Sequence, residues 1–98
     1  DLIATLANNE IVVIEKGFAI SEFMGKVFLS NAINDFKNIH LKAKYGDIIP
    51  SMCTEYRLFI FKILENIKDE YRGLAIKEVI VPTIGEFETK DLLKALKL

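Results

Sequence analysis

The chain has 98 residues, of which 51% are hydrophobic and 28% are charged. This is the length of one small domain, with enough apolar side chains for a core and too many for a disordered chain. The formal net charge of -1 argues against a protein that binds nucleic acid through its overall charge, because such proteins are usually basic. A local basic face is still compatible with this charge.

The sequence also bears on where the protein works. A single cysteine, Cys53, excludes an internal disulfide and fits a reducing compartment. No apolar run approaches the roughly 18 to 20 residues that cross a bilayer, and no basic segment precedes an apolar stretch as in a signal peptide. The chain starts at Asp1 rather than Met. We therefore expect a cytoplasmic protein with no membrane partner, and a single small domain over residues 1–98 that is a fragment of a longer chain.

The first third of the chain predicts the end of a helix and then a β-hairpin. Residues 1–10 carry apolar side chains at helical spacing and finish near two asparagines. The β-branched run IVVIE, residues 11–15, is typical of a strand. Lys16-Gly17 would make the turn, and FAISEF, residues 18–23, would form the return strand.

After Gly25 the pattern changes from strand to helix. Apolar side chains over residues 29–39 predict an amphipathic helix. The Ser21 hydroxyl and Glu22 are placed to meet the first free N–H groups of that helix. A loop is expected over residues 46–50, which contain a glycine and a proline.

The strongest helical pattern covers residues 54–71, TEYRLFIFKILENIKDEY. Its apolar arc is wider than that of an ordinary surface helix, because Leu58 and Phe61 lie beside the main stripe. Such a helix is either central to the domain or shared with another subunit. Residues 74–82, LAIKEVIVP, predict a strand, and Thr89 is expected to cap a last short helix.

This order of elements predicts an α+β fold, with a winged-helix-like hairpin followed by helices and a long central amphipathic helix. The residues LANNEIVVIEKGFAISEFMGKVF resemble a winged helix-turn-helix from its third helix onward. The match covers residues 2–33 and is similar to MarR- and PadR-like regulators and to the winged-helix module of Ski2-like helicases. The phrase ISEFMGK is one residue longer than the common form and has Ser for Thr. Two helices of a complete winged helix would precede Asp1.

The resemblance implies a non-catalytic binding module of a DNA-associated protein, either a transcription regulator or a helicase. The wing and the basic stretch after it would contact the phosphates of double-stranded DNA. Residues 16–44 hold five lysines against two acidic residues, which supports this. The alternative is a solvated helix end whose cations suit the helix dipole. The predicted nucleic-acid-binding residues are Lys16, Lys26, Lys37, Lys42 and Lys44.

A second hypothesis belongs to a different functional class. The wide apolar arc of helix 54–71 would be a protein-interaction or oligomerisation surface that binds a second copy or another protein. Its predicted interface residues are Tyr56, Leu58, Phe59 and Phe61. An aromatic stripe at this spacing is also typical of a core. The net charge favours the interaction hypothesis, whereas the hairpin favours DNA.

The sequence contains no complete catalytic, metal or cofactor motif. His40 is the only histidine, and nothing nearby completes a zinc site or a proton-transfer pair. Cys53 is either a thiol activated by the following helix or, more commonly, an inert one. Glu86, Glu88 and Asp91 suit the dipole of the last helix better than a metal ion. We therefore predict no enzyme activity, no metal and no cofactor.

Overall fold

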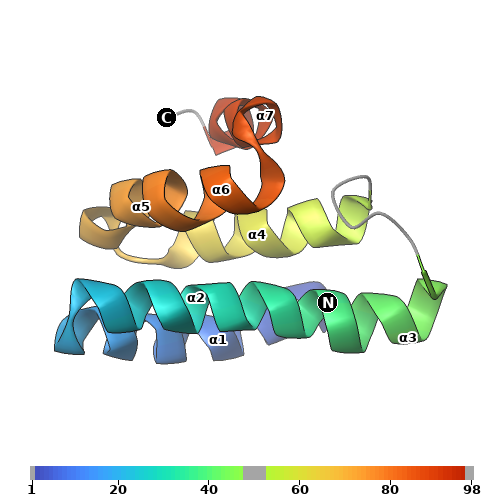
Figure 1. Cartoon of the computed structure of the whole chain (residues 1–98), viewed down its shortest axis with the longest axis horizontal. Helices are drawn as coiled ribbons and strands as arrows, with labels where there is room; N and C mark the ends of the chain where they lie inside the picture. Colours follow the sequence, from blue (N-terminus) through green and yellow to red (C-terminus); the bar gives the residue numbers. More distant parts are fainter. Residues whose placement is uncertain (1, 48–52, 97–98) are drawn as a thin grey trace.

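The computed structural model describes residues 2–47 and 53–96, and its regular structure is helical (Figure 1). In chain order the elements are α1 (Leu2–Ile20), α2 (Glu22–Asp35), the π-helix η1 (Phe36–Leu41), α3 (Lys42–Tyr45), α4 (Thr54–Asn66), α5 (Asp69–Ala75), the π-helix η3 (Ile76–Ile80), α6 (Val81–Ile84) and α7 (Glu86–Leu96). No strand occurs in the described residues. The predicted α+β class and the winged-helix resemblance are therefore wrong. Most of the expected loop, residues 48–50, lies outside the described residues.

The segment predicted to be the wing hairpin lies within α1 and the start of α2. Ala7, Ile11, Ile14 and Phe18 are all buried, and their spacing places them on one face of a helix. The β-branched residues around them can adopt helical geometry at a small cost in propensity. Packing of this face against the rest of the core outweighs that cost.

The two glycines of the supposed hairpin allow α1 and α2 to pack closely. A Cβ atom added to Gly25 would lie 2.2 Å from the Phe18 Cγ atom. A Cβ atom added to Gly17 would lie 2.5 Å from the Phe28 ring. Both residues are inside helices, so their lack of a side chain serves a helix–helix contact rather than a β-turn.

The turn between α1 and α2 is at Ser21. Its backbone is extended, with φ -167° and ψ 158°, and its hydroxyl accepts a hydrogen bond from the Met24 N–H at 3.1 Å. Glu22 follows in the first turn of α2, where a carboxylate suits the helix dipole. The predicted capping by Ser21 is confirmed, but the capped helix begins earlier than Gly25.

The predicted helix 54–71 is interrupted. It ends as α4 at Asn66, because Ile67 has extended backbone with φ -73° and ψ 161°. The Arg72 guanidinium stabilises the break, since its Nη2 atom donates to the carbonyl oxygen of Glu65 at 3.1 Å. The chain then turns into α5.

The predicted strand over residues 74–82 is also wrong, since α5, η3 and α6 cover it. Ala75, Val79 and Ile80 are buried from this helical run. Thr89 does not cap α7, which begins three residues earlier at Glu86. Its buried hydroxyl instead donates to the carbonyl oxygen of Gly85 at 2.7 Å.

The helices form layers around α4 (Figure 1). The α1–α2 hairpin lies along one side of α4, and α7 crosses the other side. In the run between α4 and α7, η3 also packs on α2. Side chains of α4 are therefore buried from both directions: Tyr56, Phe59, Ile60, Ile63 and Leu64. None of the helices in the described part of the chain combines the length and apolar character needed to cross a bilayer.

Candidate functional site

A cleft with a volume of about 310 Å³ lies between α4 and α7. Figure 1 shows α7 nearly end-on above α4, which runs across the view, so the two helices cross at a steep angle. Leu58 and Phe61 of α4 line the cleft on one side, and Leu92 and Ala95 of α7 line it on the other. These four side chains make the interior of the cleft apolar.

Charged groups join the two helices at the rim of the cleft. The Arg57 Nε atom lies 3.1 Å from Glu88 Oε2, and the Arg57 Nη2 atom lies 3.7 Å from Asp91 Oδ2. The Nε and Oε2 atoms are buried but are not aligned for a hydrogen bond. Ion pairs of this kind contribute at most about 1 kcal/mol each. They hold α7 across α4, and Arg57 balances one of the two carboxylates.

The predicted interface residues of α4 divide between two environments. Tyr56 and Phe59 are buried in the core of the chain itself, and the Phe59 ring stacks on Phe36 with centroids 4.1 Å apart. Leu58 is 43% exposed and Phe61 is half-buried, and both face the cleft. Leu58 and Phe61 are thus the two side chains of this set that another molecule can contact.

Phe87 lies one helical turn before the cleft on α7, although the sequence does not single it out. It lies in the first turn of α7 and is 76% exposed. Asp91 and Ala95 follow it at four-residue intervals, so all three share one face of α7. The sequence signal is an aromatic residue that falls outside the apolar stripe of this helix. The acidic and basic residues around Phe87 make this aromatic residue hard to recognise from the sequence.

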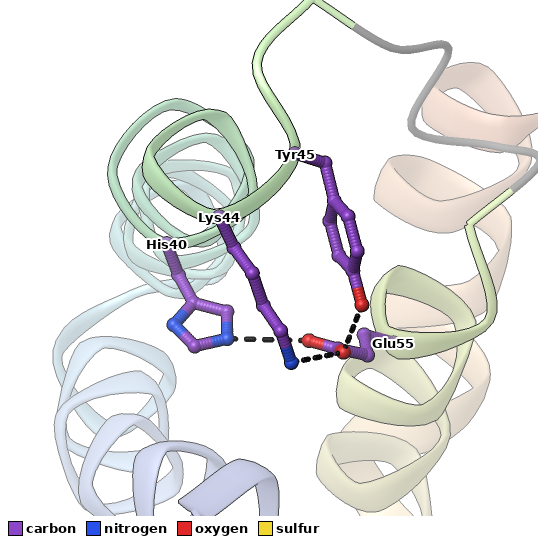
Figure 2. Close-up of polar contacts among 4 residues, drawn as sticks. All are labelled: His40, Lys44, Tyr45 and Glu55. Carbon is purple, nitrogen blue, oxygen red and sulfur yellow. Dashed lines mark hydrogen bonds and ion pairs between the residues drawn. The ribbon is translucent and has the colours of Figure 1, made fainter.

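A polar cluster joins the first turn of α4 to η1 and α3 (Figure 2). The Glu55 carboxylate accepts hydrogen bonds from the Lys44 ammonium at 2.7 Å and from the Tyr45 hydroxyl. The His40 Nε2 atom lies 3.3 Å from the other carboxylate oxygen. The His40 ring also stacks on Phe36, with centroids 4.9 Å apart. Of the four polar residues in this cluster, only His40 and Lys44 are singled out from the sequence alone.

The charges in this cluster indicate a structural tie rather than proton transfer. Hydrogen bonds from Lys44 and then Tyr45 lower the pKa of Glu55 from 4.5 to about 2. The same contacts raise the pKa of Lys44 and of the Tyr45 hydroxyl. A carboxylate held in its ionised form by several donors is a weak general base near neutral pH. The cluster instead links α3 to the first turn of α4.

The predicted nucleic-acid-binding lysines are spread along the molecule. Lys16 is near the α1–α2 turn, whereas Lys42 and Lys44 are in α3 at the opposite end of the hairpin (Figure 1). The helical run from Glu22 to Lys44 spans about 33 Å at 1.5 Å per residue. The wing that would have brought these residues to one DNA surface is absent from the described residues.

The remaining two lysines lie between these ends. Lys26 is half-buried and lines a groove of about 480 Å³ between α2 and the η3–α6 run. Lys37 is exposed on η1. A role in nucleic-acid binding stays a prediction for all five lysines.

The other candidate groups show no built site. Cys53 is half-buried before α4, and its side chain makes no capping hydrogen bond. Glu86 and Glu88 are in the first turn of α7, where their charge suits the helix dipole. Within residues 2–47 and 53–96, no three His, Cys, Asp or Glu side chains gather where they could hold a metal ion.

Comparison with known proteins gives no match to a family model, a curated protein or a solved structure. The geometry of the described residues is therefore the basis for assigning a function.

Proposed function

We propose that this chain is a protein-interaction domain that self-associates through α4 and α7. The surface concerned, here named the α4–α7 face, consists of Thr54, Arg57, Leu58, Phe61, Phe87, Asp91, Lys94 and Ala95. The observation that carries the proposal is the apolar cleft in this face, with Leu58 and Phe61 open to it. Contiguous apolar surface that is rimmed by polar groups is typical of protein–protein contact sites.

The size and charge of the face suit a second copy of the chain. A stable interface buries about 800 Å² per partner, which is roughly a seventh of the 5873 Å² accessible surface of the chain. A two-fold axis brings the same surface of both copies together, so a strongly charged face would repel itself. Within the face Arg57 and Lys94 stand against Asp91, and Glu88 adjoins the face through its ion pair with Arg57, so the charges there are mixed and nearly balanced.

A matched pair of substitutions tests this function. Leu58→Asp places a charge in the cleft, whereas Val13→Asp places one on the outer side of α1. The two parent side chains are similarly exposed, at 43% and 45%. Sedimentation velocity should show a wild-type dimer that Leu58→Asp dissociates and Val13→Asp preserves. Equal loss in both variants, or no dimer in the wild type, would contradict the proposal.

A second candidate function is binding of double-stranded DNA by the lysines of η1 and α3. The observation that favours it is local: Lys37, Lys42 and Lys44 lie in a segment, residues 36–46, that contains no acidic residue. Lys44 also pairs with Glu55, which reduces its availability. This function depends on phosphate contacts alone and includes no wing.

Titration of labelled duplex DNA tests the second candidate. The logarithm of the binding constant should fall with the logarithm of salt concentration, with a slope of about -0.9 per phosphate contacted. The double substitution Lys37→Glu with Lys42→Glu should abolish binding, and Leu58→Asp should leave it unchanged. Absence of binding at low salt would contradict this function.

A further inference from the structure

The α4–α7 face carries both an apolar cleft and an apolar side chain that projects from the surface. Phe87 is 76% exposed in the first turn of α7. The cleft begins at Asp91, one helical turn further along α7, and continues to Ala95. Phe87 and Ala95 are separated by about 12 Å along the helix axis at 1.5 Å per residue. The projection and the cleft are therefore neighbours on one surface.

The cleft is large enough for an aromatic ring. A closed apolar cavity of about 150 Å³ accepts a benzene molecule, and this cleft has a volume of about 310 Å³. Leu58, Phe61 and Leu92 would surround the ring with apolar atoms. An edge or face contact with the Phe61 ring would add to the free energy gained from burial.

We propose that the chain forms a two-fold symmetric dimer in which Phe87 of each copy occupies the α4–α7 cleft of the other. This inference rests on the proposed self-association and specifies how the two copies meet. When a two-fold axis passes between Phe87 and the cleft, the Phe87 ring of each copy lies at the cleft of the other, and the two contacts are equivalent. Such an arrangement closes on itself, so it produces a dimer and not an open chain of copies.

The polar rim is compatible with this geometry. The Arg57 Nη2 atom and the Asp91 Oδ2 atom are 3.7 Å apart, which is too far for a hydrogen bond. The Asp91 carboxylate can therefore accept one from the second copy. Asp91 is 44% exposed in its side chain, and Lys94 on the next turn is exposed as well. Opposite charges at these positions give each copy a complementary rim around the ring. Such rim contacts contribute more to specificity than to affinity.

A second exposed phenylalanine supplies the control for the experiment. Phe23 is 69% exposed and lies at the start of α2, which does not contribute to the α4–α7 face. Phe87→Ala should raise the dimer dissociation constant at least about tenfold, because aromatic residues at interface centres contribute most of the binding energy. Phe23→Ala should change it by less than about twofold. Circular dichroism checks that both variants keep the helical fold.

The position of the ring is tested directly by isotope-filtered nuclear magnetic resonance. Equal amounts of ¹³C-labelled and unlabelled chain are mixed, so that only contacts between copies are detected. Cross-peaks between the Phe87 ring and the Leu58 methyl groups are expected. A monomeric wild type would contradict the proposed function itself. A dimer that tolerates Phe87→Ala, or whose intermolecular cross-peaks omit Phe87, would contradict only the inference about this ring.

Discussion

Because α1 packs closely on α2, even a glycine-to-alanine substitution between these helices should lower the stability of the fold. Gly25→Ala adds one methyl group at a point where its carbon would lie 2.2 Å from the Phe18 ring. That ring cannot move aside at low cost, because Phe18 is buried and stacks on Tyr71 with centroids 4.8 Å apart. Either the two helices separate or the stacked pair is disrupted.

Two opposing effects set the magnitude. Overpacking of a core position costs about 1–3 kcal/mol, whereas Ala in place of Gly in a helix contributes about 0.5–1 kcal/mol of stability. We therefore expect Gly25→Ala to lower the free energy of unfolding by about 1–2 kcal/mol. For a domain of this size that corresponds to a melting temperature lower by roughly 5 to 15 °C.

Gly73→Ala is the matched control. Gly73 lies in α5, and a Cβ atom there would meet nothing within 4 Å. Only the propensity effect remains, so this variant should be more stable than wild type by about 0.5–1 kcal/mol. Urea unfolding followed by circular dichroism at 222 nm measures both variants. In a Phe18→Ala background, Gly25→Ala should lose its destabilising effect. If Gly25→Ala is instead as stable as Gly73→Ala in the wild-type background, the reasoning about the α1–α2 contact is refuted.

Further predictions concern the core and two carboxylates. Phe59→Ala should lower the free energy of unfolding by about 3–5 kcal/mol in urea titrations, because its buried ring stacks on Phe36; a loss below about 1 kcal/mol would contradict its place in the core. Burial and then the charge of Asp35 raise the pKa of Glu10 above 4.5, so the ionised form destabilises the fold. Glu10→Gln should therefore raise the melting temperature at pH 7, with a gain that shrinks as the pH falls and disappears below pH 4.5; a loss at pH 7 would refute this. The effect of Glu55 on stability has the opposite sign. Because its pKa in the folded chain is about 2, its contribution to the free energy of unfolding is complete above pH 4.5 and is lost as the pH falls towards 2. The difference in melting temperature between wild type and Glu55→Gln should shrink over that range, and a constant difference would argue against the cluster.

Much of the α-helical structure is encoded locally, but the sequence pattern of α1 supports two interpretations. The run IVVIE has the composition of a strand, yet Ile11 and Ile14 also continue a helical face that starts at Ala7 and ends at Phe18. A five-residue run cannot distinguish the two periods. The deciding fact is the packing of that face on α2 and α4, which is tertiary information. Ser21, in contrast, is predicted to cap a helix because capping depends on residues within one turn.

The glycines led to the largest error for a related physical reason. Glycine permits a turn and also permits close approach of two helices. Gly17 and Gly25 serve the second purpose, and only their contacts with Phe28 and Phe18 show this. A positive φ, which a turn would use, occurs instead at Gly46 and Gly85 among the described residues.

The candidate site was partly accessible from the sequence. Leu58 and Phe61 are recognised as side chains that widen the apolar arc of their helix, because that depends on helical periodicity alone. The other side of their cleft is formed by α7, which the contacts of Arg57 with Glu88 and Asp91 hold against α4. Contacts between residues so distant in sequence leave no local signal.

Self-association through the α4–α7 face is the central claim, and sedimentation equilibrium of the unmodified chain tests it most directly. The chain has a mass of 11.2 kDa. Across a concentration series from about 1 μM to about 500 μM, which brackets micromolar dissociation constants, the average mass should rise towards twice that value. A mass that stays at 11.2 kDa throughout the series would contradict the account.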